Sequence, residues 1–221
     1  MNEAPPSQRA DGAAPSAGAA PRELYQRLDK TARRPYSKNE YLRRFAWEFV
    51  QATLFRWSPM KAHRWRRFLL RLFGATIPDT SVVRRSARIQ HPWLLTMGEH
   101  SAIAEDVLVY NLGPIRLGDH TVVSQRSHLC AGTHDYHRED LPLLRSFITI
   151  GHGVWICADA FVGPDVTVGD NALVGARAVV MRDVPPAMIV AGNPARVVKA
   201  RPRPEGVGDG SVNPKREEAG R

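Results

Sequence analysis

The sequence predicts a mainly β protein, in which a parallel β-helix of hexapeptide repeats is preceded by two α-helices. Three observations predict it: an apolar residue recurs every six positions in the second half of the chain, two segments with helical spacing precede the repeats, and both ends are rich in Ala, Pro and Gly. A period of six fits neither the 3.6-residue period of a helix nor a sustained alternation.

The six-residue repeat is clearest between residues 150 and 180, where Gly often follows the aliphatic residue and a small or β-branched residue follows four positions later. Three such strands would close one triangular coil, and coils stacked about 4.8 Å apart would align the aliphatic side chains in a central column. The unbroken series is Ile150, Ile156, Val162, Val168, Val174 and Val180.

Two breaks in the period predict loops that leave the column. The step from Met97 to Leu117 is two more than a multiple of six. The step from Leu129 to Ile150 is three more than a multiple of six. We expect the larger insertion at about residues 134–147.

Two helices are expected before the repeats. Ser37 and Glu40 form a capping box for a helix over about residues 38–56, Ser58-Pro59 interrupts it, and a second helix runs over about residues 60–73. Their apolar stripes are expected to cap the open end of the column. The expected boundaries are a disordered tail at 1–22, a basic helical segment at 23–76 capping the coil, a β-helix catalytic domain at 77–200 and a disordered tail at 201–221.

The net charge of +9 lies entirely outside the repeats. Residues 1–76 hold 15 Lys/Arg and 6 Asp/Glu, whereas residues 77–200 hold 11 and 12. This distribution argues against a nucleic-acid groove along the protein and favours local attraction of the helical segment to an anionic surface. Weak association with a membrane surface through residues 56–71 is therefore an alternative to a purely capping role. Without a secretory signal or membrane span in the sequence, we expect a cytoplasmic protein, with a peripheral position at the inner face of the membrane as an option.

Two further motifs resemble a known family. The segment Gly132-Thr133-His134-Asp135-Tyr136 opens the larger insertion, and the repeats end in Val190-Ala191-Gly192-Asn193-Pro194-Ala195-Arg196. With the hexads, these segments resemble the hexapeptide-repeat acetyltransferases, especially the colanic acid biosynthesis type related to galactoside, maltose and nodulation-factor acetyltransferases. The resemblance implies a left-handed β-helix, acetyl-CoA as co-substrate without a metal, a sugar or glycan hydroxyl as acceptor, and a homotrimer with active sites at subunit interfaces.

The resemblance also implies roles for individual residues. His134 matches the histidine that removes the proton from the acceptor hydroxyl, a task suited to imidazole near neutral pH. The acceptor-binding positions are Asn111, Asp135 and Trp155, and the cofactor-binding positions are Ala158, Ala176, Arg182 and Arg196. Arginine suits the phosphates of coenzyme A because guanidinium binds phosphate through two parallel hydrogen bonds.

Two other functions fit a β-helix. A zinc enzyme like the γ-class carbonic anhydrases could use His128, His134 and His137 as ligands. A non-catalytic trimeric scaffold would leave the basic helices as the functional part.

Overall fold

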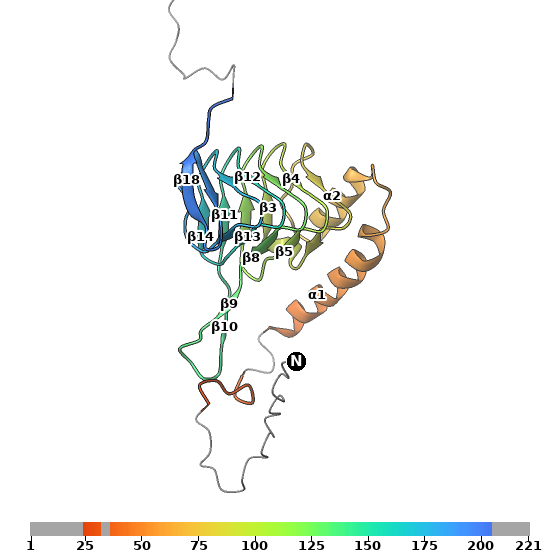
Figure 1. Cartoon of the computed structure of the whole chain (residues 1–221). Coiled ribbons are helices and arrows are strands. Elements are labelled where there is room, and N and C mark those ends of the chain that lie inside the picture. Colours follow the sequence, from red (N-terminus) through yellow and green to blue (C-terminus); the bar gives the residue numbers. More distant parts are fainter. Residues whose placement is uncertain (1–23, 32–35, 205–221) are drawn as a thin grey trace, which may run out of the picture.

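The computed structural model describes residues 24–31 and 36–204 of the 221-residue chain. They form a column of short parallel strands with helices at one end and a projecting hairpin (Figure 1). The tails expected at residues 1–22 and beyond residue 204 lie outside the described residues. Residues 201–204 are described, and Arg201 is tied to the column because its N–H donates to Ala187 O at 2.8 Å.

Three sheets form the sides of the column, and each is named here by one strand. The β12 face contains β1 (Val82–Val83), β4 (Ala102–Ile103), β7 (Val122–Val123), β12 (Trp155–Ile156), β15 (Leu173–Val174), β17 (Met188–Ala191) and the antiparallel β18 (Arg196–Ala200). The β8 face contains β2 (Arg88–Ile89), β5 (Leu108–Tyr110), β8 (His128–Cys130), β13 (Phe161–Val162) and β16 (Val179–Val180). The β11 face contains β3 (Leu95–Met97), β6 (Ile115–Leu117), β11 (Ile148–Ile150) and β14 (Val166–Val168).

Successive coils differ in length but keep one register. Val82 pairs with Ala102 and Ala102 with Val122, so these two coils have the same length. Val122 then pairs with Trp155 across a much longer coil, and Trp155 pairs with Leu173 across a shorter one. The extra residues leave the column and return without shifting the strands on either side, as the two breaks in the period predict.

The repeat places its aliphatic residues inside the column, as predicted. Ile150, Ile156, Val162, Val168, Val174 and Val180 are each at most 1% exposed. Burying a side chain of this size contributes roughly 1.5–3 kcal/mol.

A third extension occurs in the first coil, where η2 (Pro92–Leu94) is a short 3-10 helix. It accounts for the long step from Ile89 to Met97, an interval that the sequence analysis did not single out. The break between Met97 and Leu117 corresponds to an extension at residues 111–114 in the next coil. The two extensions lie side by side, because His91 N donates to Asn111 Oδ1 at 2.9 Å.

The first helix begins where predicted, and the second begins at His63, after its expected start near residue 60. α1 (Lys38–Val50) has Ser37 as its N-cap, whose Oγ accepts a hydrogen bond from Glu40 N at 3.2 Å. It continues into a π-helical turn, η1 (Gln51–Phe55), and α2 follows at His63–Leu72.

Most of the apolar stripe expected to cover the column end faces away from it, although Leu69 of the second helix is buried in the core. On α1 only Trp47 is buried, whereas Leu42, Phe45 and Phe49 are 63–70% exposed. On α2 the buried residues are Arg66, Arg67, Leu69 and Leu70.

Unpaired carbonyl groups of the first coil explain this orientation. Trp47 Nε1 donates to Ile89 O at 2.7 Å, Arg66 Nε to Val83 O at 2.8 Å and Arg67 Nη1 to Ser81 O at 3.1 Å. Because a buried carbonyl without a donor is costly, the end of the column needs side chains that carry N–H groups as well as apolar ones. The helices therefore cover the column end with Trp and Arg side chains beside the buried Phe55, Leu69 and Leu70.

The larger insertion forms a hairpin of β9 (Thr133–His134) and β10 (Leu143–Leu144). It projects from the edge between the β8 and β11 faces (Figure 1). Residues 24–31 lie against its tip, where Arg27 N donates to Glu139 O at 2.6 Å and Thr31 Oγ1 donates to Asp140 O at 2.9 Å. Within residues 24–31 and 36–204, no helix has the length and apolar character needed to cross a bilayer.

Trp47→Ala is expected to lower the free energy of unfolding by about 3–5 kcal/mol, because it leaves a large cavity and an unpaired carbonyl at Ile89. Phe45→Ala on the same helix should change it by less than about 0.5 kcal/mol, since Phe45 is 70% exposed. Urea denaturation of both variants measures the difference. Equal destabilisation would contradict the orientation described above.

Candidate active site

His134 lies on the first strand of the hairpin, opposite Leu143, and its side chain is exposed. Its Nδ1 lies 2.7 Å from Leu141 O. A carbonyl oxygen only accepts hydrogen bonds, so Nδ1 of the neutral imidazole carries the proton and Nε2 carries the lone pair. The Nε2 lone pair of the neutral ring therefore lies on an exposed side chain of the hairpin.

Asp135 does not orient the His134 ring through a hydrogen bond in this structure. Its Oδ1 accepts from His137 N at 3.0 Å, and its N–H donates to Pro142 O at 3.1 Å. These contacts shape the hairpin, and Asp135 Oδ2 is left for another partner.

A hollow of about 420 Å³ lies beside His134 at the base of the hairpin. Tyr36, Tyr110 and Arg145 line it, and sequence reasoning missed all three. The Arg145 guanidinium lies 4.7 Å from the centre of the Tyr36 ring and 3.1 Å from Glu40 Oε1. Burial raises the pKa of the Tyr110 hydroxyl. No sequence signal marks these residues, because they converge from the segment before α1, from β5 and from the end of the hairpin.

Asn111 is not placed to contact a substrate. It is 0% exposed, its Nδ2 donates to His91 O at 2.6 Å, and its Oδ1 accepts from His91 N. The expectation of an acceptor-binding Asn111 is therefore not supported, since the amide clamps one coil to the preceding one.

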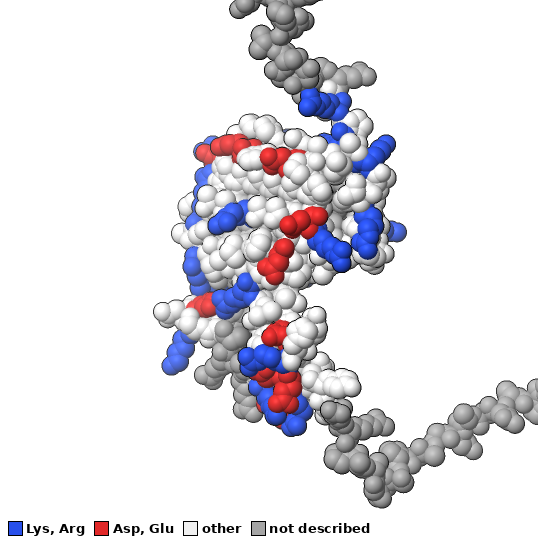
Figure 2. All heavy atoms as spheres, turned by 90° about the vertical axis from the view of Figure 1, so that its left-hand side faces the viewer, with Lys and Arg blue, Asp and Glu red and all other residues white. Residues whose placement is uncertain are grey.

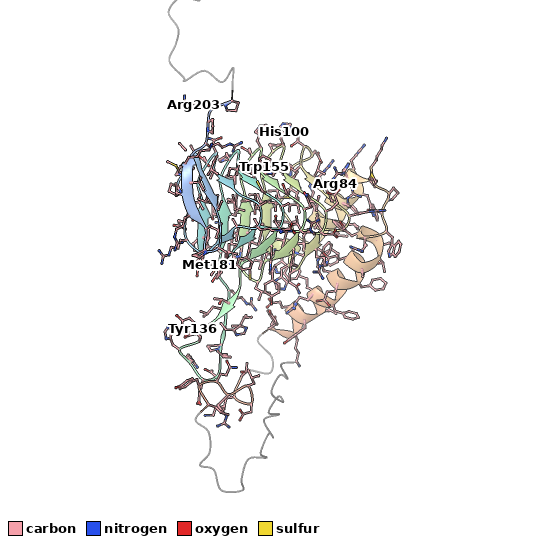
Figure 3. The ribbon with its side chains drawn as sticks, viewed as in Figure 1. Arg84, His100, Tyr136, Trp155, Met181 and Arg203 are labelled. Carbon is pink, nitrogen blue, oxygen red and sulfur yellow. The ribbon has the colours of Figure 1, made fainter. Side chains whose placement is uncertain are left out.

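Trp155 lies on the opposite side of the column from the hairpin. It is on β12 and is 45% exposed, and its Nε1 donates to Ser124 Oγ at 2.9 Å. In a three-sided column, the β12 face is opposite the edge from which the hairpin leaves, as the positions of Trp155 and Tyr136 in Figure 3 show. One chain does not bring Trp155 and His134 into one pocket.

Ala158 and Ala176 occupy the same corner of successive coils, on the edge between the β12 and β8 faces. Arg177 N donates to Ala158 O at 3.0 Å, and Val179 N donates to Gly192 O at 2.9 Å in the next coil. These small side chains therefore mark an edge that leads toward the C-terminal end of the column.

Arg182 and Arg196 line one hollow of about 340 Å³ at that end, together with Met181 and Asp183. Figure 2 looks onto this end of the molecule, where Lys and Arg side chains are interspersed with Asp and Glu. The structure thus brings together the two arginines that the sequence analysis assigned to cofactor binding, at a site separate from His134.

The three histidines considered as zinc ligands do not form a cluster in the chain. The ring of His128 lies between Tyr110 and Phe161, with centroid distances of 6.3 and 5.1 Å. Among the residues that the structure describes, no group of three or more His, Cys, Asp or Glu side chains could hold a metal ion.

Comparison with known proteins defines the class of this column. Residues 147–182 match the family model for the bacterial transferase hexapeptide (six repeats). The repeats and the fold together define a hexapeptide-repeat transferase.

The chain is 46% identical over 155 residues to the "Putative colanic acid biosynthesis acetyltransferase WcaF" of Escherichia coli K12, covering 70% of this chain and 85% of that protein. It is 26% identical over 137 residues to the galactoside O-acetyltransferase of the same organism, covering 61% and 68% of the two chains. The chain therefore belongs to the hexapeptide-repeat acetyltransferase family, and it is an acetyltransferase.

A solved hexapeptide-repeat acetyltransferase from Vibrio cholerae O1 biovar eltor, complexed with acetyl coenzyme A, shares the fold. Its TM-score is 0.69 at 23% identity, and the match covers 80% of this chain and 96% of that one. The predicted fold class, a left-handed β-helix preceded by two helices, is confirmed.

The buried His91 beneath the Tyr36 side of the hollow predicts a pH-dependent stability. Burial lowers the pKa of His91 to about 4, and its Nδ1 donates to Asn111 O at 3.0 Å. The unfolded chain therefore binds more protons between about pH 4 and 6.5, so the free energy of unfolding falls as the pH drops through this window. His91 alone should account for a loss on the order of 3 kcal/mol.

Denaturation of the native protein and of His91→Phe between pH 7 and pH 4 measures this contribution. The variant also loses the hydrogen bond to Asn111, but that loss does not depend on pH. A smaller pH slope in the variant is expected, and equal slopes would contradict the assignment.

Proposed function

We propose that the protein transfers an acetyl group from acetyl-CoA to a hydroxyl of a sugar, with His134 as the general base. The observation that carries the proposal is the hydrogen bond between His134 Nδ1 and Leu141 O, which in the neutral ring puts the lone pair on Nε2, on an exposed hairpin. The family supplies the acetyl chemistry, and the free Nε2 supplies the base that an alcohol nucleophile needs.

The reaction needs one proton acceptor and one good leaving group. His134 Nε2 takes the proton from the hydroxyl as its oxygen attacks the carbonyl carbon of the thioester. The tetrahedral intermediate then expels the thiolate of coenzyme A as the C–S bond breaks, and the proton passes from Nε2 to the sulfur. No covalent intermediate on the protein is required, because the hydroxyl oxygen attacks the thioester directly.

We place acetyl-CoA along the edge that carries Ala158 and Ala176. Small side chains there leave room for the narrow pantetheine arm, and Arg182 and Arg196 in their shared hollow would bind the phosphates. Acetyl-CoA is the bound molecule named for the Vibrio cholerae relative, which supports the same donor here.

We propose a homotrimer in which each active site lies between two subunits. His134 and Asp135 lie on the hairpin, whereas Trp155 and the Ala158 edge lie elsewhere on the column, so a single chain holds the parts of the site separately. Columns packed side by side would bring the hairpin of one copy to the β12 face of the next. Asp135 and Trp155 would then contact the acceptor together.

The proposed acceptor is a sugar of an exopolysaccharide or cell-surface glycan, modified in the cytoplasm. The name of the 46% identical relative places that protein in colanic acid biosynthesis. The tyrosine hydroxyl groups beside His134 offer hydrogen-bond donors and acceptors, which suit a hydroxylated ring.

His134→Ala is expected to lower kcat for acetyl transfer by about 10²–10⁴, with acetyl-CoA binding unchanged, because only proton removal is lost. His137→Ala is the matched control, since His137 is another exposed histidine of the same hairpin, and it should retain turnover. Release of the coenzyme A thiol with a panel of sugars and glycan precursors measures turnover, and titration calorimetry measures binding. Full activity in His134→Ala, or stoichiometric zinc in purified protein without thiol release, would overturn the proposal.

Arg182→Ala and Arg196→Ala should each raise KM for acetyl-CoA roughly tenfold or more with little change in kcat, because each removes a charge-assisted hydrogen bond to a phosphate. Arg116→Ala, an exposed arginine on the β11 face, is the control and should leave KM unchanged. The same experiment with acetyl pantetheine, which lacks the nucleotide, should abolish the difference between the arginine variants and the native protein. An unchanged KM in both variants would place the phosphates elsewhere.

A further inference from the structure

We infer that the N-terminal end of the column is a docking surface for an anionic lipid bilayer. The surface, called here the helical tip, consists of the exposed apolar residues Leu54, Trp57, Met60, Trp65, Phe68 and Leu72 of η1, α2 and the turn between them. The inference assigns a partner to the outward apolar face of the helices and does not depend on acetyl transfer.

The apolar side chains of the helical tip are largely exposed. Trp57 is 82% exposed, Met60 68% and Leu72 66%, and the other three members of the tip are 41–53% exposed. Trp65 and Phe68 stack with their ring centres 5.7 Å apart, and Trp65 Nε1 donates to Leu54 O at 3.1 Å. These contacts join Leu54, Trp65 and Phe68 into one cluster, and Trp57 and Met60 are exposed on the turn between η1 and α2. Exposed apolar surface of this kind marks an interaction site, and Trp is favoured at the interface between water and lipid.

A buried arginine holds the turn that carries Trp57 and Met60. Arg66 is 0% exposed, and its Nη1 donates to Ser58 Oγ and to Pro59 O, each at 2.9 Å. Its Nη2 donates to Met60 O at 3.0 Å. The same guanidinium binds the first coil at Val83 O, so the column and the turn form one rigid unit. A preformed turn loses little conformational entropy when its side chains enter another phase.

Positive charge surrounds the tip. Arg56, Lys61 and Arg64 are exposed, and none of them forms an ion pair with a described residue. The sequence has no acidic residue between Glu48 and Asp79. A basic rim around an apolar centre matches the charge pattern of surfaces that bind anionic lipid.

A hollow of about 420 Å³ behind Trp57 adds room for a phosphate headgroup. Its lining consists of Arg56, Trp57, Met60, Arg84, Arg85, Ser86, Glu105 and Asp106. Glu105 Oε1 lies 3.3 Å from Arg84 Nε, so Arg84 is paired, and Arg56 and Arg85 remain available for a phosphate. Arg84 lies at the helical end of the column in Figure 3.

The position of the helical tip at one end of the column favours a flat surface as its partner. The helices and the turn between them lie at the end of the column opposite β18 (Figure 1), away from the C-terminal hollow of Arg182 and Arg196. If columns assemble side by side as proposed above, every helical tip points in the same direction. Several tips could then bind one bilayer at once, which raises the overall affinity without new contacts.

Two other occupants fit the surface less well. A second copy docked end to end would bring the basic rims of two tips together, and such like-charge contacts are unfavourable. Residues 1–23 of the same chain contain no aromatic and no branched aliphatic side chain, so they lack the groups needed to cover the apolar residues.

Vesicle flotation of the full chain tests the inference. Phosphatidylcholine vesicles with and without phosphatidylglycerol are the probes, at low and at high salt. The native protein should bind only the vesicles that contain phosphatidylglycerol, and salt should weaken the binding. Trp57→Ser combined with Met60→Ser should reduce binding at least about tenfold, because two inserted side chains are lost. Lys61→Glu combined with Arg64→Glu should reduce it to a similar extent.

Matched controls lie at the other end of the column. Val198→Ser replaces an apolar residue that is 61% exposed on β18, and Arg203→Glu reverses an exposed charge, so both should keep native binding. Light scattering of each variant without vesicles reports self-association, and circular dichroism confirms folding. Failure of the native protein to bind anionic vesicles, or equal binding by the Trp57 and Met60 variant, would overturn the inference. A fall in particle mass in that variant would assign the tip to a second copy instead.

Discussion

The register between stacked coils is the constraint on which the rest of the structure depends. Main-chain hydrogen bonds run from coil to coil, as from Val122 N to Val154 O at 2.9 Å and from Trp155 N to Ala172 O at 3.1 Å. Each coil contacts only its neighbours, so the column has two ends at which strands lack a partner. At one end Trp47 and the arginines of α2 bind the free carbonyls, and at the other β18 turns back antiparallel to β17. The need to close two ends places the helices and the C-terminal hairpin where they are.

The residues of the proposed active site lie on different edges and faces of the column. His134 is carried on the edge between the β8 and β11 faces, Ala158 and Ala176 follow the edge between the β12 and β8 faces, and Trp155 lies on the β12 face itself. A rigid prism cannot fold these surfaces toward one another. Partial sites on separate surfaces become one complete site only when copies of the chain stand side by side, so assembly and activity are coupled in the proposed function.

Much of the fold could be predicted from the sequence, because an aliphatic residue must face inward once in every flat strand and the period records it directly. The start of the first helix at Ser37 and the two insertions at the breaks in the period were also predicted. Hydropathy did not predict that Trp47, Arg66 and Arg67 face the column, because it does not record that carbonyl groups at the column end need hydrogen-bond donors. Asn111 was misassigned because its partner, His91, is one coil away, and a contact of that kind has no local signal. For the same reason the sequence did not reveal Tyr36, Tyr110 and Arg145 beside His134.

The uninterrupted pairing across the longest coil has a consequence for how such proteins diversify. Ile148, the first residue of β11 after the hairpin, pairs with Ile115 below and Val166 above as if no insertion had occurred. The excursion is therefore a replaceable module: its length and composition can change while the flanking coils keep the same neighbours. On the proposed function, changes in this segment can alter the choice of acceptor while the strand pairing of the column stays the same. Exchanging hairpins between relatives is then a route to new specificities on an unchanged frame.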